Sequence, residues 1–312
     1  MLVPKYSLQV QGCHVHVSEH RVGVKLTLRA PAKLNLSLAV VGREADGFHR
    51  LVSCVVPLVL ADTLDFLPGG SVDTIDCDDA SIPTDQSNLV LRAAEVFRSA
   101  YPAAPYGHFS LTKKVPHGAG LGGGSSDAAA ALCLLNQAAG CPFDNAHLRI
   151  LATKVGSDCA FFIDPVPAVM RQRGEALSHI PDACAVAYRG RKVLLLKPTF
   201  SVSTASAYGW LAAEGGYIQE PEAEAALAAA LPKPDAVVKL GNSLQAPVFA
   251  HHPQLLAGLQ ALQSTLGISA VMTGSGSACF AFINGSVDLA KVQATLEPAW
   301  GADVWATISE IA

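Results

Sequence analysis

The pattern of apolar and polar positions predicts strands and helices that alternate irregularly along the chain. Strand-like alternation occurs at 24–30, 34–41, 51–60, 62–67, 108–115, 168–177, 193–196, 278–283 and 303–308, with Pro31 interrupting the first stretch. Helical spacing of apolar residues occurs at 88–100, 126–139, 144–155, 203–213, 223–230, 253–266 and 287–296. Because strands and helices are mixed rather than strictly alternating, the pattern predicts an α+β fold.

The two ends of this pattern suggest a domain organisation. Residues 1–22 do not continue it, and we expect them to form a dispensable N-terminal extension. Within that extension His14 and His16 could touch a metal, but a pair of histidines without a third ligand is more often incidental. The remainder is expected to divide loosely between 182 and 191, giving domains at 23–185 and 186–312.

A glycine-rich stretch between a strand and a helix is the strongest chemical signal. Five of the seven residues from Gly118 to Gly124 are glycines, and the alanine-rich helix at 126–139 follows directly. Glycines allow consecutive backbone N–H groups to turn toward an anion, and the helix N-terminus adds a partial positive charge. Lys113 and Lys114 lie just upstream. The stretch therefore predicts a phosphate-binding loop.

Other interpretations of this loop fit less well. A Walker loop needs a lysine after its last glycine, and Gly124 is followed by Ser125. The dinucleotide pattern GxGxxG matches Gly118, Gly120 and Gly123, with Asp144 about 20 residues further on. The preceding strand at 108–115, however, alternates like a half-exposed antiparallel strand. A dinucleotide-binding oxidoreductase remains the alternative from another class, and protection by NAD(P) rather than ATP against thermal unfolding would favour it.

The composition of the chain limits the cellular compartment and the classes of partner that it can have. The chain has 312 residues, of which 50% are hydrophobic and 15% charged, and its net charge of −4 gives no electrostatic footprint for nucleic acid or an anionic membrane. No apolar run approaches the ~20 residues of a membrane span, and we see no signal-peptide core. Eight cysteines lack metal-ligand spacing, so buried free thiols in a reducing compartment are expected. These features predict a cytoplasmic protein that binds a small molecule, without nucleic acid or membrane partners.

Three separate stretches resemble the three motifs of the GHMP kinases, namely 31–36, 116–126 and 273–276. Within that superfamily, 30–36, the Asp-Gly-Phe-His turn at 46–49, the triple glycine in 120–126, and 156–162 resemble the 4-diphosphocytidyl-2-C-methyl-D-erythritol kinase family. The resemblance extends from about Val24 to the C-terminus. The glycine motif marks the superfamily, whereas the turn at 46–49 points to this one family.

The resemblance implies a two-domain GHMP kinase fold with the active site in the cleft between the domains. The ATP-binding domain at 23–185 would resemble domain 2 of ribosomal protein S5, and the domain at 186–312 would be similar to an α/β plait. ATP and Mg²⁺ are implied, with phosphorylation of the 2-hydroxyl of 4-diphosphocytidyl-2-C-methyl-D-erythritol in the non-mevalonate isoprenoid pathway. A monomer or weak homodimer is expected. The alternative within the superfamily is a kinase for another small alcohol, such as homoserine or mevalonate.

By the same resemblance, Lys33 and Asp158 are the catalytic pair. An aspartate would accept or orient the proton of the attacking hydroxyl, while an adjacent ammonium would keep the carboxylate ionised. The local sequence pattern alone favours structural roles for both residues. Asp158 follows Gly156 as an N-cap or turn aspartate would, and Lys33 could be a solvent-facing lysine at a strand edge.

The remaining site residues are also assigned by resemblance. Asn35, Phe48, His49 and Thr204 would bind substrate, with Phe48 stacking on cytosine where relatives usually carry tyrosine, and Thr204 equally fits a helix N-cap. Gly274 and Gly276 would allow close approach of the chain, and Gln245 stands where relatives commonly carry glutamate. The expected ATP-binding residues are Asn88, Leu89, Lys113, Pro116, Gly118, Gly120, Leu121, Gly122, Gly123, Gly124, Ser125 and Ser126. The local pattern of Asn88, Leu89 and Lys113 alone indicates only a helix start and a strand lysine. Ser125 or Ser126 could reach Mg²⁺ or simply cap the helix.

Overall fold

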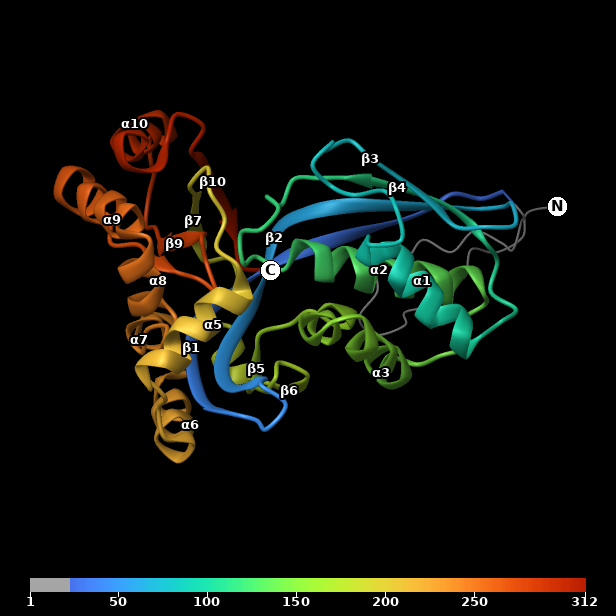
Figure 1. Cartoon of the computed structure of the whole chain (residues 1–312), viewed down its shortest axis with the longest axis horizontal. Helices are drawn as coiled ribbons and strands as arrows, with labels where there is room; N and C mark the ends of the chain where they lie inside the picture. Colours follow the sequence, from blue (N-terminus) through green and yellow to red (C-terminus); the bar gives the residue numbers. More distant parts are fainter. Residues whose placement is uncertain (1–22) are drawn as a thin grey trace. The chain divides into compact units, whose positions relative to one another are not determined.

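The computed structural model describes residues 23–312, so the predicted extension and the His14–His16 pair lie outside the described residues. The chain forms two compact units (Figure 1). Unit 1 contains residues 23–30 together with Thr63–Thr112 and Asp127–Asp164, and unit 2 contains Pro31–Asp62, Lys113–Ser126 and Pro165–Ala312. The predicted boundaries at 22/23 and 185/186 stay a prediction. Each unit is described separately.

Two long strands contribute residues to both units. These are β1 (Leu26–Arg43) and β2 (His49–Pro68), which pair with each other. The sequence predicts a break at Pro31 and another at 61, and both predictions are wrong. Proline is compatible with a strand wherever no ladder hydrogen bond needs its nitrogen. The intervening turn is as predicted: the Glu44 N–H donates to Phe48 O at 2.7 Å, and Gly47 has a φ of +92°.

Unit 1 adds two strands to β2. Strand β4 (Gly107–Thr112) pairs antiparallel with β2 in the register Thr63↔Thr112, and β3 (Thr74–Cys77) lies parallel to β4. The rings of Phe66 and Phe109 meet across the first pair with centroids 4.6 Å apart. The antiparallel pairing with β2 agrees with the predicted strand type. The next strand after the glycine loop, Ala168–Gln172, pairs with β2 and not with β4, so the loop does not lie in the βαβ unit of adjacent parallel strands that a dinucleotide fingerprint requires.

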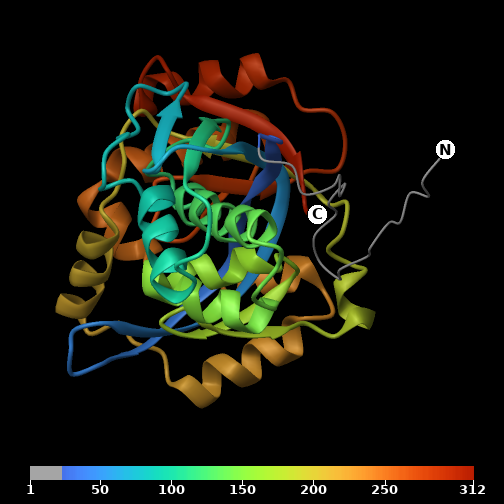
Figure 2. The ribbon, with the colours of Figure 1, turned by 90° about the vertical axis from the view of Figure 1, so that its right-hand side faces the viewer.

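Helices α1 (Leu89–Ala100), α2 (Gly123–Ala138) and α3 (Asn145–Val155) lie on one side of these strands (Figures 1 and 2). Helix α1 buries Val90, Ala94 and Phe97 at helical spacing. Helix α3 has Asp144 as N-cap and Gly156 as C-cap, which agrees with the predicted helix at 144–155. The 3₁₀ helix η1 (Ser157–Ile163) follows.

Unit 2 contains a hairpin where one strand was predicted at 168–177. Strands β5 (Ala168–Gln172) and β6 (Ala176–His179) pair antiparallel, and β5 also pairs with residues 51–55 of β2. The prediction fails because Gly174 turns the chain back with a φ of +118°.

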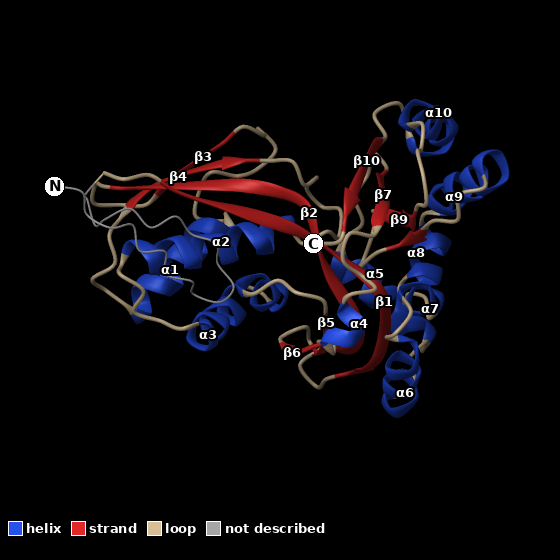
Figure 3. Cartoon of the chain, turned by 180° about the vertical axis from the view of Figure 1, so that it is seen from behind, coloured by secondary structure: helices blue, strands red, loops and turns tan. Residues whose placement is uncertain are grey.

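The rest of unit 2 is a four-stranded antiparallel sheet in the order β10-β7-β9-β8, with helices around it (Figure 3). Strand β7 (Lys192–Lys197) buries both faces: Leu195 packs with the core that includes α6 and α7, and Leu194 packs with the core beneath α5, α8, α9 and α10. The other elements are α4 (Asp182–Ala185), α5 (Thr204–Glu214), α6 (Glu220–Ala230), α7 (Pro234–Lys239), α8 (Gln245–His251), α9 (Pro253–Leu266), β8 (Val271–Met272), β9 (Cys279–Phe282), α10 (Leu289–Trp300) and β10 (Trp305–Glu310).

Two predictions from composition bear on the described residues. None of the helices in this part of the chain has the length and apolar character needed to cross a bilayer. The cysteines between 23 and 312 are free thiols, as expected, but only Cys54, Cys159 and Cys279 are fully buried.

Candidate functional site

The glycine loop in unit 2 is fixed in place by the residues between its glycines. Ala119 and Leu121 are buried in the core, the Ala278 N–H donates to Ala119 O at 3.1 Å, and the Lys33 N–H donates to Leu121 O at 2.9 Å. Gly118, Gly120 and Gly122 alternate with them at φ values of +63°, +79° and +73°. The loop is therefore a turn of defined shape, held by backbone hydrogen bonds and by two buried side chains.

Two glycines from distant motifs touch each other at this loop. A Cβ on Gly274 would lie 3.0 Å from Gly120 O, 3.4 Å from Asn35 Oδ1 and 3.6 Å from Lys33 Nζ. A Cβ on Gly120 would lie 3.0 Å from Gly276 O. The expected close approach is confirmed, and it brings the Lys33–Asn35 segment, the glycine loop and the turn at 273–276 together within one compact unit.

We expect Gly120→Ala to damage this junction more than its conformational strain alone would. Its left-handed φ costs about 1–2 kcal/mol for any other residue, and the added methyl group pushes the loop off the 273–276 turn. Because a shift of about 1 Å near reacting groups can cost about 100-fold in rate, kcat/KM should fall by at least about tenfold. Gly190→Ala is the matched control, since Gly190 has a φ of +72° and nothing within 4 Å of its Cβ position. Equal activity losses in the two variants would contradict the packing argument.

Lys33 is buried beside Asn35, so the interpretation as a solvent-facing lysine is wrong. Their exposed fractions are 5% and 3%, and Lys33 Nζ donates to Asn35 Oδ1 at 2.5 Å. Ser53 orients the side-chain amide of Asn35. The Ser53 hydroxyl donates its proton to Ser37 O at 2.6 Å, so toward Asn35 Nδ2, at 2.8 Å, it acts as the acceptor. The amide oxygen is thereby directed at the ammonium.

The backbone of Asn35 is held by a residue that sequence reasoning missed. Thr273 Oγ1 accepts from the Asn35 N–H at 2.9 Å and donates to Asn35 O at 3.2 Å. Asn242 Nδ2 in turn donates to Met272 O at 3.1 Å and to Gly274 O at 2.8 Å. These side chains fix the turn against β1. The available signal in the sequence was the position of Thr273 at the start of the motif at 273–276.

Lys113 and the entry to the loop are tied to Asp62, another residue that the sequence analysis passed over. Lys113 Nζ lies 2.5 Å from Asp62 Oδ2, while Asp62 Oδ1 accepts from the Lys114 N–H at 2.5 Å and from the Val115 N–H at 2.8 Å. Asp62 has no exposed surface. The available signal in the sequence was an aspartate within the apolar run of β2, because a buried carboxylate needs hydrogen-bond donors or a cation as partners.

The start of α2 differs from the prediction of 126–139. The helix begins at Gly123, three residues earlier, so Gly123 to Ser126 form its first turn and their N–H groups include the free donors of a helix N-terminus. Among the described residues, the buried Ser126 Oγ has no hydrogen-bond partner. A buried hydroxyl left unpaired costs about 1–3 kcal/mol, which suits an atom that a ligand completes.

The turn at 46–49 has two distinct side chains. Phe48 is 56% exposed, whereas His49 lies beneath Tyr208, with ring centroids 4.9 Å apart, and its Nε2 is 3.2 Å from the hydroxyl of Tyr217. Burial, with a smaller contribution from Arg43, lowers the pKa of His49. The imidazole is therefore neutral at neutral pH. Because Nε2 is paired with Tyr217, Nδ1 is the ring nitrogen that can meet a base edge, as donor or acceptor according to the tautomer.

Two further predicted positions in unit 2 have clear roles. The N-cap of α5 is Ser203, so the N-cap interpretation of Thr204 is wrong. Thr204 Oγ1 lies 2.8 Å from Ser275 Oγ in the 273–276 turn. Gln245 Oε1 accepts from the Met272 N–H at 2.9 Å and so supports the same turn. A carboxylate would serve equally as that acceptor.

Asp158, Asn88 and Leu89 belong to unit 1. Asp158 is partly buried in the first turn of η1, whose N-cap is Gly156, so its interpretation as an N-cap is wrong. Asn88 is the N-cap of α1: its Oδ1 accepts from the Val90 N–H at 2.9 Å, and its Nδ2 donates to Pro83 O at 2.6 Å. The helix-start interpretation of Asn88 is confirmed, and the catalytic and adenine-binding roles stay predictions.

Comparison with known proteins decides the family. The models described as "GHMP kinases N terminal domain" and "GHMP kinases C terminal" match residues 88–171 and 220–303. A 4-diphosphocytidyl-2-C-methyl-D-erythritol kinase of Deinococcus radiodurans is 35% identical over 289 residues, covering 90% of this chain and 92% of that protein. One from Synechococcus sp. (strain CC9902) is 36% identical over 303 residues, covering 90% and 96%.

The chain belongs to the 4-diphosphocytidyl-2-C-methyl-D-erythritol kinase family, one of the GHMP kinases.

Solved structures agree with this membership. The chain superimposes on a crystal structure of 4-(cytidine 5'-diphospho)-2C-methyl-D-erythritol kinase with a TM-score of 0.73 and 31% identity, over 92% of this chain and all of that one. A homoserine kinase from Cytophaga hutchinsonii gives a TM-score of 0.68 at 16% identity, covering 96% and 98%, which shows a shared fold alone. The two-domain α+β GHMP kinase fold is thereby confirmed.

Proposed function

We propose that this chain transfers the γ-phosphate of ATP to the 2-hydroxyl of 4-diphosphocytidyl-2-C-methyl-D-erythritol. One observation carries the proposal: Lys33, Asn35, Gly120 and Gly274, drawn from three GHMP motifs, meet at one buried junction in unit 2. The names of the curated relatives supply the substrate. Phosphoryl transfer needs positioning and charge stabilisation more than covalent chemistry, and a buried lysine beside a glycine loop provides both.

The phosphate end of the site would be the turn from Gly118 to Gly124. Its glycines leave the backbone N–H groups unobstructed, and the first turn of α2 directs further donors and the positive end of the helix dipole toward an anion. The Lys33 ammonium would stabilise charge on the oxygen that attacks or on the phosphoryl group in transfer. Asn35, held by Ser53 and Thr273, would keep the ammonium aimed at that position.

The residues present fit Mg²⁺ brought by a nucleotide. No group of three or more histidine, cysteine or acidic side chains within 23–312 is arranged to hold a metal on its own. Mg²⁺ is commonly bound through substrate phosphates with few protein ligands, and the unpaired Ser126 Oγ at the loop is the atom that would reach it. When bound, the ion would neutralise phosphate charge.

The cytidine end would be the turn at 46–49. Phe48 offers an exposed ring for stacking, and neutral His49 offers hydrogen-bonding groups for a cytosine edge. Thr204, paired with Ser275, would contact the substrate near the 273–276 turn. Asp158 is proposed as the carboxylate that orients the attacking hydroxyl, on the strength of the motif at 156–162. A cytoplasmic location and a monomeric or weakly dimeric state stay predictions.

The test is incubation of the purified chain with ATP, Mg²⁺ and 4-diphosphocytidyl-2-C-methyl-D-erythritol, followed by mass spectrometry. We expect the mass of the acceptor to rise by one phosphate, with ³¹P NMR placing the new ester on the 2-hydroxyl. Homoserine, mevalonate and 2-C-methyl-D-erythritol 4-phosphate are the control acceptors. Equal kcat/KM with an acceptor that lacks cytidine would contradict the substrate assignment, and stabilisation by NAD(P) but not by ATP would contradict the kinase assignment.

A further inference from the structure

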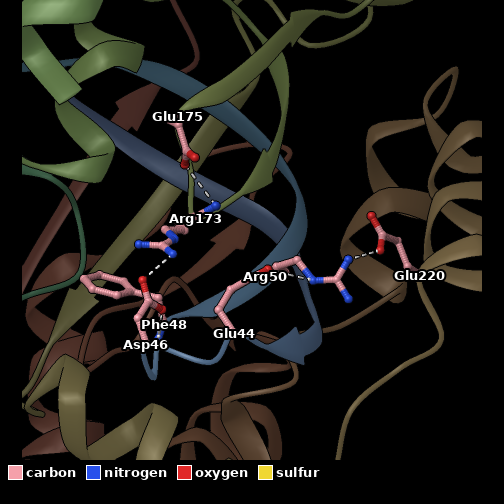
Figure 4. A network of polar contacts seen from close by, with 7 residues as sticks. All are labelled: Glu44, Asp46, Phe48, Arg50, Arg173, Glu175 and Glu220. Carbon is pink, nitrogen blue, oxygen red and sulfur yellow. Dashed lines mark hydrogen bonds and ion pairs between the residues drawn. The ribbon is translucent and has the colours of Figure 1, made fainter.

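The ring of Phe48 is exposed at the tip of the β1–β2 turn, yet it has one defined neighbour. No ring contact joins Phe48 to another aromatic side chain within 23–312, and more than half of the side chain faces solvent. The guanidinium carbon of Arg173 lies 4.5 Å from the ring centroid, a distance typical of a cation–π contact. Figure 4 shows the planar group beside the ring.

The same guanidinium is fixed by the turn that carries Phe48. Arg173 Nη2 lies 2.5 Å from Asp46 Oδ2, and Asp46 Oδ1 accepts from the Phe48 N–H at 3.2 Å. The pKa of Asp46 is lowered first by the Phe48 N–H and then by Arg173, so the carboxylate stays charged and can hold both groups. The Asp46 carboxylate thus binds both the backbone N–H of Phe48 and the Arg173 guanidinium that lies over the Phe48 ring.

Arg173 itself is placed by a tight turn on the adjacent hairpin. Gln172 and Gly174 have positive φ values of +57° and +118°, and the Arg173 N–H donates to Glu175 Oε2 at 2.9 Å. The register Leu51↔Gln172 between β2 and β5 brings this turn beside the turn at 46–49. The contact with Phe48 is therefore set by backbone structure on both sides.

We infer that Arg173 is a positioning residue that covers one face of the Phe48 ring and fixes it, so that the opposite face is a ready platform for the base of the nucleotide substrate. The inference rests on the proposed function. A side chain that is ordered before binding loses less conformational entropy when the ligand stacks on it. Arg173 therefore acts on base affinity through Phe48, without taking part in phosphoryl transfer.

The experiment compares Arg173→Ala with wild type for KM of each substrate and for kcat. An exposed cation–π contact is worth about two- to fivefold in affinity, so KM for the cytidyl substrate should rise by about that factor. KM for ATP and kcat should not change. Arg171→Ala is the matched control, because Arg171 lies two residues earlier, on β5, and loses a two-point ion pair with Glu224, at 2.6 Å and 2.9 Å, without touching Phe48. Its KM values should equal those of wild type.

A double-mutant cycle with Phe48→Ala decides whether Arg173 acts through the ring. Stacking is worth enough that Phe48→Ala alone should raise KM for the cytidyl substrate by about tenfold or more. Arg173→Ala should then add nothing in that background. An unchanged KM in Arg173→Ala, a matching rise in Arg171→Ala, or full additivity in the double variant would overturn the inference. Failure of wild type to phosphorylate the cytidyl substrate would instead overturn the proposed function.

Discussion

Lys33→Met is expected to lower kcat by about 100- to 1,000-fold, because a preorganised cation at developing charge contributes that much to phosphoryl or acyl transfer. The buried ammonium is the charged group nearest the contact between Gly274 and the glycine loop, and methionine fills its volume without its charge. The measurement is kcat at saturating ATP and cytidyl substrate. Asn35 Oδ1 loses its donor, so the free energy of unfolding should also fall, by about 1–2 kcal/mol.

Lys197→Met is the control for removing a buried lysine charge. Lys197 is also in unit 2 and is 9% exposed, but its Nζ donates to Pro198 O, and burial lowers its pKa. We expect its kcat to be close to that of wild type. If Lys33→Met keeps kcat within tenfold of wild type, or if both variants lose kcat equally, Lys33 has no special role in the transfer step.

Asp158→Asn is the second large expected effect, with a decrease in kcat of about 100- to 10,000-fold from loss of the group that orients the hydroxyl proton. The amide is nearly the same size as the carboxyl, so the melting temperature should stay close to that of wild type. The measurement is single-turnover phosphorylation, which separates transfer from product release.

Asp164→Asn is the matched control, because Asp164 ends the same 3₁₀ helix and pairs with Arg149 at 3.2 Å. It should transfer phosphate at the wild-type rate. Near-normal single-turnover rates in Asp158→Asn would remove this carboxylate from the mechanism.

Secondary structure could be predicted well where residues close in sequence determine it. Helices α1 and α3 begin where the pattern predicts them, with Asn88 and Asp144 as their N-caps, and the turn at Gly47 is where Asp-Gly indicates it. Errors arose where tertiary contacts override local pattern. Asp62 lies inside a continuous strand because the backbone N–H groups of Lys114 and Val115 satisfy its carboxylate, and no local pattern shows those partners.

The candidate site could be named from motifs, but its supports could not. Lys33 and Asn35 were chosen by resemblance, while the burial that keeps them together depends on Ser53 and Thr273, 18 and 238 residues away from Asn35. The contact of Arg173 with Phe48 joins two turns that the sequence does not connect. Such pairings follow from strand register, which a single sequence specifies only weakly.

The central claim is that the Lys33 ammonium faces the reacting oxygen next to the glycine loop. The most direct measurement is a crystal structure with a non-hydrolysable ATP analogue, Mg²⁺ and the cytidyl substrate. We expect Lys33 Nζ within about 3.2 Å of the substrate 2-hydroxyl oxygen, and an amide of residues 120–124 at a similar distance from a phosphate oxygen. A 2-hydroxyl bound more than about 6 Å from Lys33 Nζ, beyond the reach of one bridging water, would contradict the account.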